Sequence, residues 1–324
     1  MESQPLLAGA HDRNPKEKPT LGRYALYYFQ LTRLHKFPLG NILVIWPCLW
    51  ALAMAAYRSG QPPRALATQS ALFALGSTLL HSAACVINDI CDIDFDRQVE
   101  RTRHRPLAAG VISVKGAWVL LAVLVAACFG MLALANPTAA FVGIFGVVPF
   151  HALYPLMKRW TNWPQAWLGI AMNWGFPVAW LSVLPRSNPA DWHEMGVVYV
   201  MMVGMLCWTI VYDTEYGCQD RADDVRAGVK STALLFGAHV RGVLVGFALV
   251  FLACLVGAGL LNAHGPAYFA IACGGAAVHF AWQFATWDVD APADCGAMFK
   301  SNGDLGYVVW AGLVLDYALR MRFV

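Results

Sequence analysis

The chain has 324 residues, of which 58% are hydrophobic and only 13% are charged, and its mean hydropathy is +0.50. Because soluble domains carry about 25% charged residues, this composition excludes an ordinary soluble protein and indicates an integral membrane protein. The net charge is +3, and we expect the lipid bilayer, and no nucleic acid, among its partners. The nine cysteines show no paired spacing, so we expect free thiols and neither disulfides nor a zinc site.

The first 32 residues are polar, and we expect a disordered tail over 1–32 followed by a single membrane domain over 33–324. The tail carries Glu2, Asp12 and Glu17. A mitochondrial presequence would be rich in arginine and poor in acid, so we favour an ER-type endomembrane over the mitochondrial inner membrane.

The rest of the chain contains stretches of about 20 mostly apolar residues, the length needed to cross a membrane. We expect an all-α protein with nine transmembrane helices. The predicted spans are 38–57, 67–87, 114–134, 137–156, 165–184, 195–214, 240–261, 266–286 and 304–321.

The basic residues predict the orientation of these nine spans. If the N-terminus is cytoplasmic, 18 of the 23 lysines and arginines lie on the cytoplasmic side, as the positive-inside rule requires. Half of the 20 acidic residues fall into two short clusters that follow the second and sixth predicted spans. Both clusters therefore lie at the same positive face.

The first acidic cluster consists of the segment "NDICDIDFD", residues 88–96, and Glu100 shortly after it. At about 100° per residue, Asn88, Asp89, Asp92 and Asp96 form one stripe on a helix, whereas Asp94 points elsewhere. A solvated loop charge is therefore the preferred reading of Asp94.

The second cluster contains Asp213, Glu215, Asp220, Asp223 and Asp224. By the same arithmetic Asp213, Asp220 and Asp224 share a face. Asp223 lies off this face, and we expect it to be a solvated loop charge. We expect the helix to break at Gly217, between the two halves of the cluster.

Two stripes of carboxylates would repel one another unless a divalent cation lies between them. Magnesium takes oxygen ligands and is usually held by one or two carboxylates together with substrate phosphates. Basic residues follow each acidic cluster, as in "RTRHRP", and could reach phosphate oxygens directly. The pattern thus predicts a diphosphate site with Mg²⁺ as cofactor.

Several long segments, in the same order, resemble the UbiA superfamily of intramembrane aromatic prenyltransferases, closest to its 4-hydroxybenzoate polyprenyltransferase branch. They are "RLHKFPLGNILVIWPCLWAL", "NDICDIDFDRQVERTRHRPLAAG", "YPLMKRWTNWPQAWLGIAMNWGFPVAW", "YDTEYGCQDRADDVRAGVKSTALLFG" and "DCGAMFKSNGDLG". The resemblance covers residues 33–324.

The resemblance implies nine helices around a central cavity and Mg²⁺-dependent transfer of an isoprenyl group from a prenyl diphosphate to a ring carbon of an aromatic acceptor. As metal ligands it implies Asp89, Asp92, Asp96, Asp213, Asp220 and Asp224. As diphosphate-binding residues we expect Asn88, Tyr154, Lys158, Arg101 and Arg105, and as acceptor-binding residues Arg33 and Lys36. The expected catalytic residues are Asp92, Asp96, Asp220, Asp224 and Lys158.

An allylic cation would need shielding from water by aromatic rings or sulfur. The candidates in the motif-bearing segments are Tyr154, Met172, Trp174, Trp208 and Tyr212. Packing or interfacial anchoring is the more frequent role of a single transmembrane tryptophan.

Two substrate readings stay open. We favour transfer of a farnesyl group to a hydroxylated aromatic acid in meroterpenoid biosynthesis, and the alternative is the 4-hydroxybenzoate polyprenyltransferase of ubiquinone biosynthesis. A cation-coupled transporter is a remote third reading. In a transporter the acidic residues should lie near the middle of the spans, whereas here they lie at one end of the spans beside basic residues.

Overall fold

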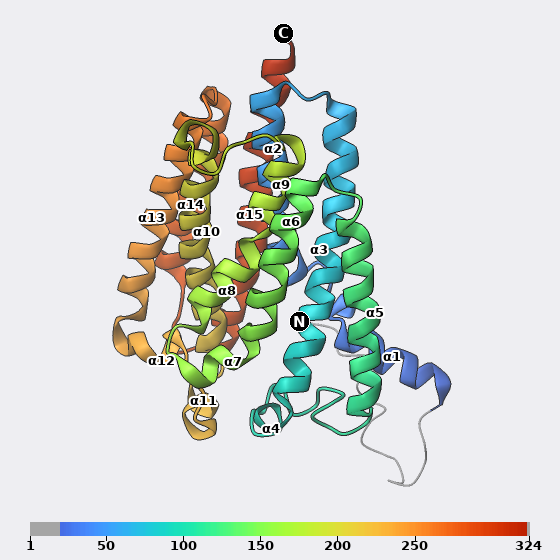
Figure 1. The fold of residues 1–324 in the computed structure, drawn as a ribbon. Coiled ribbons are helices and arrows are strands. Elements are labelled where there is room, and N and C mark those ends of the chain that lie inside the picture. Colours follow the sequence, from blue (N-terminus) through green and yellow to red (C-terminus); the bar gives the residue numbers. More distant parts are fainter. Residues whose placement is uncertain (1–19, 323–324) are drawn as a thin grey trace.

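The computed structural model describes residues 20–322, and every regular element in that range is a helix (Figure 1). Six of the helices run without interruption for 19 residues or more: α2 (Asn41–Ser59), α3 (Pro63–Cys91), α5 (Val114–Leu132), α10 (Trp192–Cys218), α13 (Val240–Leu261) and α15 (Pro292–Arg322). They stand side by side in one elongated bundle.

Three further helical segments are divided. The first consists of α6 (Pro137–Gly146), the π-helical η2 (Val147–His151) and α7 (Ala152–Trp160). The second consists of α8 (Pro164–Asn173) and α9 (Gly175–Val183), and the third of the π-helical η4 (Tyr268–Cys273) and α14 (Gly274–Thr286). The short elements are α1 (Leu21–Leu31), η1 (Leu34–Lys36), α4 (Ile93–Asp96), α11 (Arg221–Ala227), α12 (Thr232–Phe236) and η3 (Gly237–His239).

The chain is a multi-pass membrane protein. Within residues 20–322, six helical segments are long and apolar enough to cross a bilayer: Asn41–Ser59, Pro63–Cys91, Val114–Leu132, Pro137–Trp160, Trp192–Cys218 and Thr232–Leu261. The remaining three predicted spans coincide with α8–α9, with η4–α14 and with part of α15, which are interrupted or more polar. The number nine therefore stays a prediction.

The predicted polar tail is partly helical. Of residues 1–32, the structure describes those from residue 20 onward, and Leu21–Leu31 form α1. The helical part of the chain thus begins before the boundary expected at residue 33, and the rest of the predicted tail lies outside the described residues.

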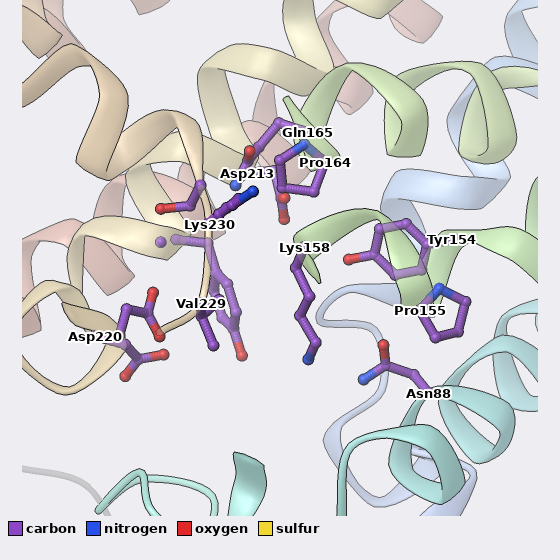
Figure 2. A pocket seen from close by; sticks show the side chains of 14 residues that line it. Asn88, Tyr154, Pro155, Lys158, Pro164, Gln165, Asp213, Asp220, Val229 and Lys230 are labelled. Atoms are coloured by element: carbon purple, nitrogen blue, oxygen red, sulfur yellow. The ribbon is translucent and has the colours of Figure 1, made fainter. Parts of the chain in front are cut away.

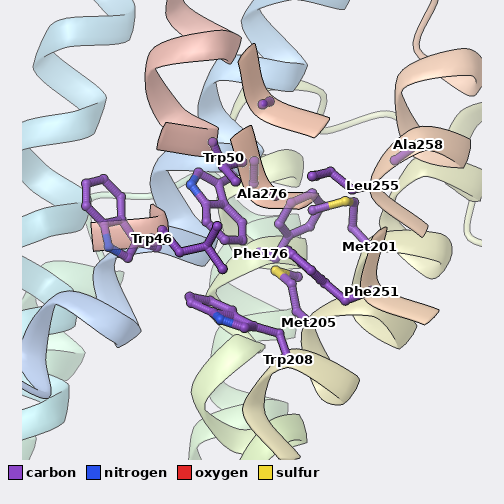
Figure 3. Close-up of a cluster of buried hydrophobic side chains, with 14 of the residues drawn as sticks. Trp46, Trp50, Phe176, Met201, Met205, Trp208, Phe251, Leu255, Ala258 and Ala276 are labelled. Carbon is purple, nitrogen blue, oxygen red and sulfur yellow. The ribbon is translucent and has the colours of Figure 1, made fainter. Parts of the chain in front are cut away.

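The hydrophobic core lies between α2, α9, α10 and α13 and is built from large aromatic rings (Figure 3). The ring centroids of Trp50 and Trp208 are 5.0 Å apart, and Phe251 packs against both rings. The indole N–H of Trp208 donates to Asn302 at 2.9 Å. Trp208, a candidate for shielding a cation, is thus a fully buried core residue.

The carboxyl ends of α3 and α10 and the helix α7 lie at one end of the bundle, together with the short helices α4, α11 and α12 (Figure 1). Both acidic clusters belong to these elements. The fold therefore brings the two clusters, which are more than a hundred residues apart in sequence, to the same end of the molecule.

Candidate active site

A cavity of about 150 Å³ lies at this end of the bundle, between α3, α7, α8, α10 and α11 (Figure 2). Six of the predicted site residues line it: Asn88, Tyr154, Lys158, Asp213, Asp220 and Asp224. Figure 2 shows Lys158 reaching into the space between Asn88 and Tyr154 on one side and Asp220 on the other.

The first acidic motif sits where a long helix ends. α3 stops at Cys91, Asp92 has a non-helical backbone (φ −104°, ψ 7°), and α4 then resumes for one turn. Asp89, Asp92 and Asp96 are buried, while the side chain of Asp94 is 89% exposed. This is the division that the helical spacing predicts.

Each buried acid of this motif has a basic partner. A guanidinium nitrogen of Arg33 lies 2.6 Å from Asp89, and Arg105 lies 3.2 Å from Asp89 and 2.9 Å from Asp96. These two acids and two bases form one network, and Asp92 pairs separately with the ammonium group of Lys158 on α7. The pairing neutralises charges that would otherwise be costly to bury.

Two carboxylate oxygens of the first acidic motif are left over. Asp89 Oδ2 and Asp92 Oδ1 are buried and have no hydrogen-bond partner among the described residues, a rare situation for a buried polar atom. No three acidic, histidine or cysteine side chains between residues 20 and 322 form a ready-made metal cluster. Neither Asp89 nor Asp92 is among the residues that line the cavity, but Lys158, the partner of Asp92, does line it. Free carboxylate oxygens suit a magnesium ion that shares its ligands with a diphosphate.

The second acidic motif also straddles a helix end. α10 continues through Gly217 to Cys218, so the expected break at Gly217 is wrong, and the backbone leaves the helix at Asp220 instead (φ −110°, ψ 8°). Gly217 serves packing, because an added Cβ would lie 3.3 Å from Ala233. The break at Asp220 turns α11 so that Asp224 lines the cavity too.

Asp224 lies in a partly desolvated and acidic environment. Burial and then the neighbouring Asp220 raise the pKa of Asp224 to about 6, against the opposing effect of Lys158 and Arg101. The carboxylate is therefore mainly ionised at neutral pH, and a cation beside it would favour the ionised form further.

Two acids of the second cluster do not face the cavity. Glu215 is fully buried on the opposite side of α10, where it accepts hydrogen bonds from Gln283 and Asn302 at 3.2 and 3.0 Å. Asp223 pairs with Arg226 and accepts the backbone N–H of Glu100.

Arg101 joins the two motifs. Its guanidinium makes a bidentate contact with Asp220, donates to the Tyr216 hydroxyl at 2.6 Å and lies over the Tyr216 ring. Tyr216 lines the cavity and was missed by the sequence reasoning, although it stands between two predicted ligands in the same motif.

Gln165 and Lys230 also line the cavity and were not predicted as site residues. Gln165 accepts the backbone N–H of Thr232 at 3.0 Å, and the backbone N–H of Lys230 donates to the carbonyl of Lys158 at 3.0 Å. These bonds fix the loop after α11 against α7 and α8. In the sequence, Lys230 could have been found as one of the basic residues that follow the second acidic cluster.

The sequence model of the UbiA prenyltransferase family matches residues 44–305, which is more than half of the chain. The UbiA prenyltransferase claS of Ampulloclitocybe clavipes is 42% identical over 316 residues, covering 96% of this chain and 97% of that protein. The 4-hydroxybenzoate octaprenyltransferase of Azotobacter vinelandii is 40% identical over 292 residues, covering 90% and 94%. The chain belongs to the UbiA prenyltransferase family. It is an aromatic prenyltransferase.

Solved structures share the fold of this UbiA chain. A UbiA homolog from Aeropyrum pernix K1 superposes with a TM-score of 0.71 at 22% identity, covering 84% of this chain and 97% of that one. A UbiA homolog from Archaeoglobus fulgidus, bound to GPP and Mg²⁺, gives a TM-score of 0.63 at 14% identity, covering 90% and 99%.

Arg33 and Lys36 lie outside the set of described residues that line the cavity of this UbiA enzyme. Arg33 is held by Asp89. The side chain of Lys36 is exposed, and partial burial together with the nearby Arg33, Arg101, Arg105 and Lys300 lowers its pKa. Such a concentration of positive charge favours a bound anion.

The remaining aromatic candidates of the UbiA chain occupy different places. Tyr154 lines the cavity at the acidic end of the bundle. Tyr212 directly precedes Asp213 in the sequence, and its hydroxyl contacts the sulfur of Met172 at 3.6 Å. Trp174 lines a second cavity. Of the five candidates, Tyr154 is therefore the one placed directly at the acids.

Proposed function

We propose that this UbiA enzyme transfers a farnesyl group from its diphosphate to a ring carbon of a hydroxylated aromatic acid, in a meroterpenoid pathway. The observation that carries the proposal is the cavity lined by Asp213, Asp220 and Asp224 from one motif and by Asn88 from the other, with Lys158 between them. Carboxylates and fixed cations around one small space suit a metal-bound diphosphate.

The proposed metal ligands are Asp89, Asp92 and Asp96 from the first motif and Asp213, Asp220 and Asp224 from the second. Magnesium bound there would neutralise the diphosphate as it leaves. The unpaired oxygens of Asp89 and Asp92 support this assignment, as does the Mg²⁺ recorded with GPP in the Archaeoglobus fulgidus homolog.

The basic residues have a distinct part in this proposal. Lys158 and Arg101 now neutralise Asp92 and Asp220, and they become available for phosphate oxygens once a metal takes those carboxylates. Their fixed positive charge then stabilises the diphosphate most strongly as the allylic C–O bond breaks. With Asn88, Tyr154 and Arg105 they form the proposed diphosphate site.

The bond electrons leave with the diphosphate, and the allylic cation that remains is attacked by an electron-rich ring carbon of the phenol. The released diphosphate acts as the base that takes the proton of that carbon, and the ring regains aromaticity. No nucleophilic side chain is needed. Tyr154 presents a π-system next to the acids, which suits it to shield the cation from water.

For the acceptor carboxylate we propose the basic surroundings of Lys36. Arg33 was the other sequence candidate, but its guanidinium is engaged with Asp89 at 2.6 Å. We propose that Arg33 positions Asp89 and that Lys36, surrounded by four other cations, attracts the acceptor's anionic group.

A second function has specific support. Relatives at 38–40% identity, among them the mitochondrial enzyme of Schizosaccharomyces pombe, are 4-hydroxybenzoate polyprenyltransferases. That assignment would use the same site with a longer donor. The transporter reading is weaker, because the acids are paired with bases at one end of the bundle and do not lie in mid-membrane.

We also propose that the N-terminus is cytoplasmic and that the protein resides in an ER-type endomembrane. The excess of basic residues in the loops at the acidic end of the bundle supports the orientation. Accessibility of single engineered cysteines in sealed microsomes, and fluorescence of a tagged chain, test the two statements.

The function is tested with the protein purified into liposomes. Geranyl, farnesyl, geranylgeranyl and octaprenyl diphosphates are each incubated with a panel of hydroxybenzoates and orsellinate-type acids, with Mg²⁺. C-prenylated product from farnesyl diphosphate and a polyketide-type acid supports the proposal. Product confined to octaprenyl diphosphate with 4-hydroxybenzoate favours the ubiquinone reading, and no product from any pair rejects both.

A further inference from the structure

Two buried cysteines meet at the acidic end of the bundle, on the side of α10 that faces away from the cavity. All nine cysteines of the described residues are free thiols. Cys218 is the last residue of α10, and Cys295 lies in the first turn of α15. Both are buried and neither lines the cavity, so the function described so far uses neither thiol.

Three contacts fix the register of α10 against α15. They are a hydrogen bond of 3.0 Å from Asn302 to Glu215, the rings of Tyr216 and Phe299 with centroids 4.8 Å apart, and the amide oxygen of Gln219, which lies 2.9 Å from a Cβ added at Gly296. The residue numbers fall along α15 as they rise along α10, so the two helices are antiparallel. Cys218 and Cys295 come next at this contact, and their thiols form a hydrogen bond.

The surroundings of Cys295 favour a thiolate. The indole N–H of Trp287 donates to the Cys295 sulfur at 3.4 Å. The guanidinium of Arg221 lies near both thiols, and its Nε is buried without a hydrogen-bond partner among the described residues. The hydrogen bond with Cys218, the indole N–H and Arg221 lower the pKa of Cys295, against the opposing effect of burial. The thiolate is the form of cysteine that reacts with oxidants.

A second pair of cysteines lacks these surroundings. Cys207 on α10 and Cys254 on α13 lie close enough to interact electrostatically. Among the described residues, no hydrogen bond and no neighbouring cation is found at either sulfur. This pair therefore serves as an internal control for the chemistry of Cys218 and Cys295.

Water-sized molecules have a short way to the first pair. Cys295 follows the connection between α14 and α15, in which Asp288 and Asp290 are exposed, and it precedes the predicted span 304–321. In the proposed orientation this end of the bundle is cytoplasmic. Disulfides of cytoplasmic proteins are usually transient and often sense oxidants.

We propose that Cys218 and Cys295 are a site of oxidative modification, at which hydrogen peroxide joins the two residues in a reversible disulfide. The Cys295 thiolate attacks one peroxide oxygen, the O–O bond breaks, and hydroxide leaves a sulfenic acid on Cys295. The Cys218 thiol then attacks that sulfur, the S–S bond forms, and water leaves. The two sulfurs give two electrons to the peroxide, which is reduced to two molecules of water, and a small thiol reverses the bond by exchange.

The disulfide would act on the active site through the end of α10. Cys218 precedes Asp220 by two residues, and Asp220 is the point where the backbone leaves the helix and pairs with Arg101. In the proposed function this carboxylate exchanges Arg101 for a metal. A bond from Cys218 to α15 holds the turn before Asp220 in place and opposes that exchange. This effect rests on the proposed function, whereas the chemistry of the two thiols does not.

The first test detects the bond itself. The enzyme in liposomes is treated with hydrogen peroxide, the remaining thiols are blocked with N-ethylmaleimide, and the protein is digested without reductant for mass spectrometry. We expect peptides joined through Cys218 and Cys295, which dithiothreitol separates, in the wild type and equally in Cys254→Ser. No such peptides in the wild type, or peptides joined through Cys207 and Cys254 in their place, overturns the proposal.

The second test measures the effect on the active site. We expect peroxide to lower kcat/KM for the donor at least about fivefold in the wild type and in Cys254→Ser, the lower end of ordinary coupling between two sites, and dithiothreitol to restore it. Cys218→Ser and Cys295→Ser should keep their activity after peroxide, and either variant suffices if the other fails to fold. An equal loss in these variants, or unchanged kcat/KM in the cross-linked wild type, overturns the proposal.

The two tests also separate this inference from the proposed function. If the reduced enzyme prenylates no acceptor, the proposed function fails, and the joined peptides alone decide the chemistry of the thiols. If prenylation proceeds and peroxide joins no peptides, the function stands and this inference fails.

Discussion

A guanidinium nitrogen of Arg101 lies 2.6 Å from the carboxylate of Asp220. The contact connects the loop after the first acidic motif to the helix break in the second motif. The same guanidinium also donates a hydrogen bond to the hydroxyl of Tyr216. The loop is thereby held over the end of α10. Arg101 is thus the described residue that most directly couples the two motifs.

We expect Arg101→Gln to raise the KM for the prenyl diphosphate at least about tenfold, because a charge-assisted contact to phosphate is lost. Arg103→Gln is the matched control. Arg103 pairs with the exposed Glu100 and is itself half exposed, so its loss should change KM less than about twofold. Equal effects of the two substitutions would show that the loop contributes only general positive charge.

We expect Asp92→Asn to lower kcat at least about 100-fold, because a buried carboxylate that would help to stabilise the departing diphosphate becomes neutral. Asp94→Asn should change kcat less than about threefold, since the side chain of Asp94 is 89% exposed. Both substitutions remove one negative charge from the same motif. Comparable losses in steady-state turnover would refute the single-face arrangement of the site.

Removal of Mg²⁺ should abolish both turnover and donor binding. Because Asp89, Asp92, Asp96 and Asp220 are paired with the protein's own bases, we expect the diphosphate to lack a strong site until a metal takes those carboxylates. We expect farnesyl diphosphate to raise the thermal unfolding temperature in Mg²⁺ and not in EDTA. Normal turnover in excess chelator would reject the metal assignment.

Lys36→Gln should raise the KM for a carboxylated acceptor at least about fivefold and leave the donor KM nearly unchanged, because it lowers the positive charge around the acceptor anion. Lys115→Gln, on the exposed start of α5, is the control. Arg33→Lys should weaken donor and acceptor binding together, since Arg33 holds Asp89. A donor-specific effect of Lys36→Gln would remove Lys36 from the acceptor site.

The far end of the bundle contains a buried histidine with a fixed protonation state. His264 Nδ1 lies 2.9 Å from Asp316, and Asn262 lies 3.0 Å from His264 Nε2. The Asn262 amide nitrogen also donates to Met54, and its oxygen accepts from Arg58. These bonds fix the amide so that Nε2 of His264 must accept, which requires a neutral ring.

Burial lowers the pKa of His264 below its ordinary 6.5, against the opposing effect of Asp316. The unfolded chain therefore binds the proton more readily, so the stability from this group is complete above pH 6.5 and declines as the pH falls through it. We expect the unfolding temperature of the wild type to drop more between about pH 7.5 and about pH 5.5 than that of His264→Gln. The same pH slope in both proteins would rule out His264 as the titrating group.

The sequence alone located both acidic motifs, because period and spacing determine which carboxylates share a face. Asp92 is buried and Asp94 exposed, as helical arithmetic requires. The same arithmetic could not reveal that Glu215 bonds to Gln283 and Asn302 in the core, since those partners lie on helices distant in sequence. It also could not reveal which base holds which acid.

The helix breaks were harder to place than the helices. A glycine was the natural candidate for the interruption in α10, yet Gly217 remains helical and the chain turns at Asp220. Glycine lowers helix stability only modestly, and tight packing against Ala233 favours it there for its size. Trp208 was similarly ambiguous, because its place in the core depends on Trp50 and Phe251 from two other helices.

The internal pairing of acids and bases has a consequence for the order in which ligands arrive. A magnesium ion that comes alone and takes the paired oxygens of Asp92 or Asp220 displaces Lys158 or Arg101 and leaves that cation without a partner. A metal that arrives with a diphosphate gives each displaced base a new anion. Metal and donor should therefore bind with strong positive cooperativity, and by linkage each raises the affinity of the other by the same factor. In the resting enzyme Asp92 and Asp220 are paired with Lys158 and Arg101. On binding, the metal replaces the bases as partner of the carboxylates, and the diphosphate replaces the carboxylates as partner of the bases.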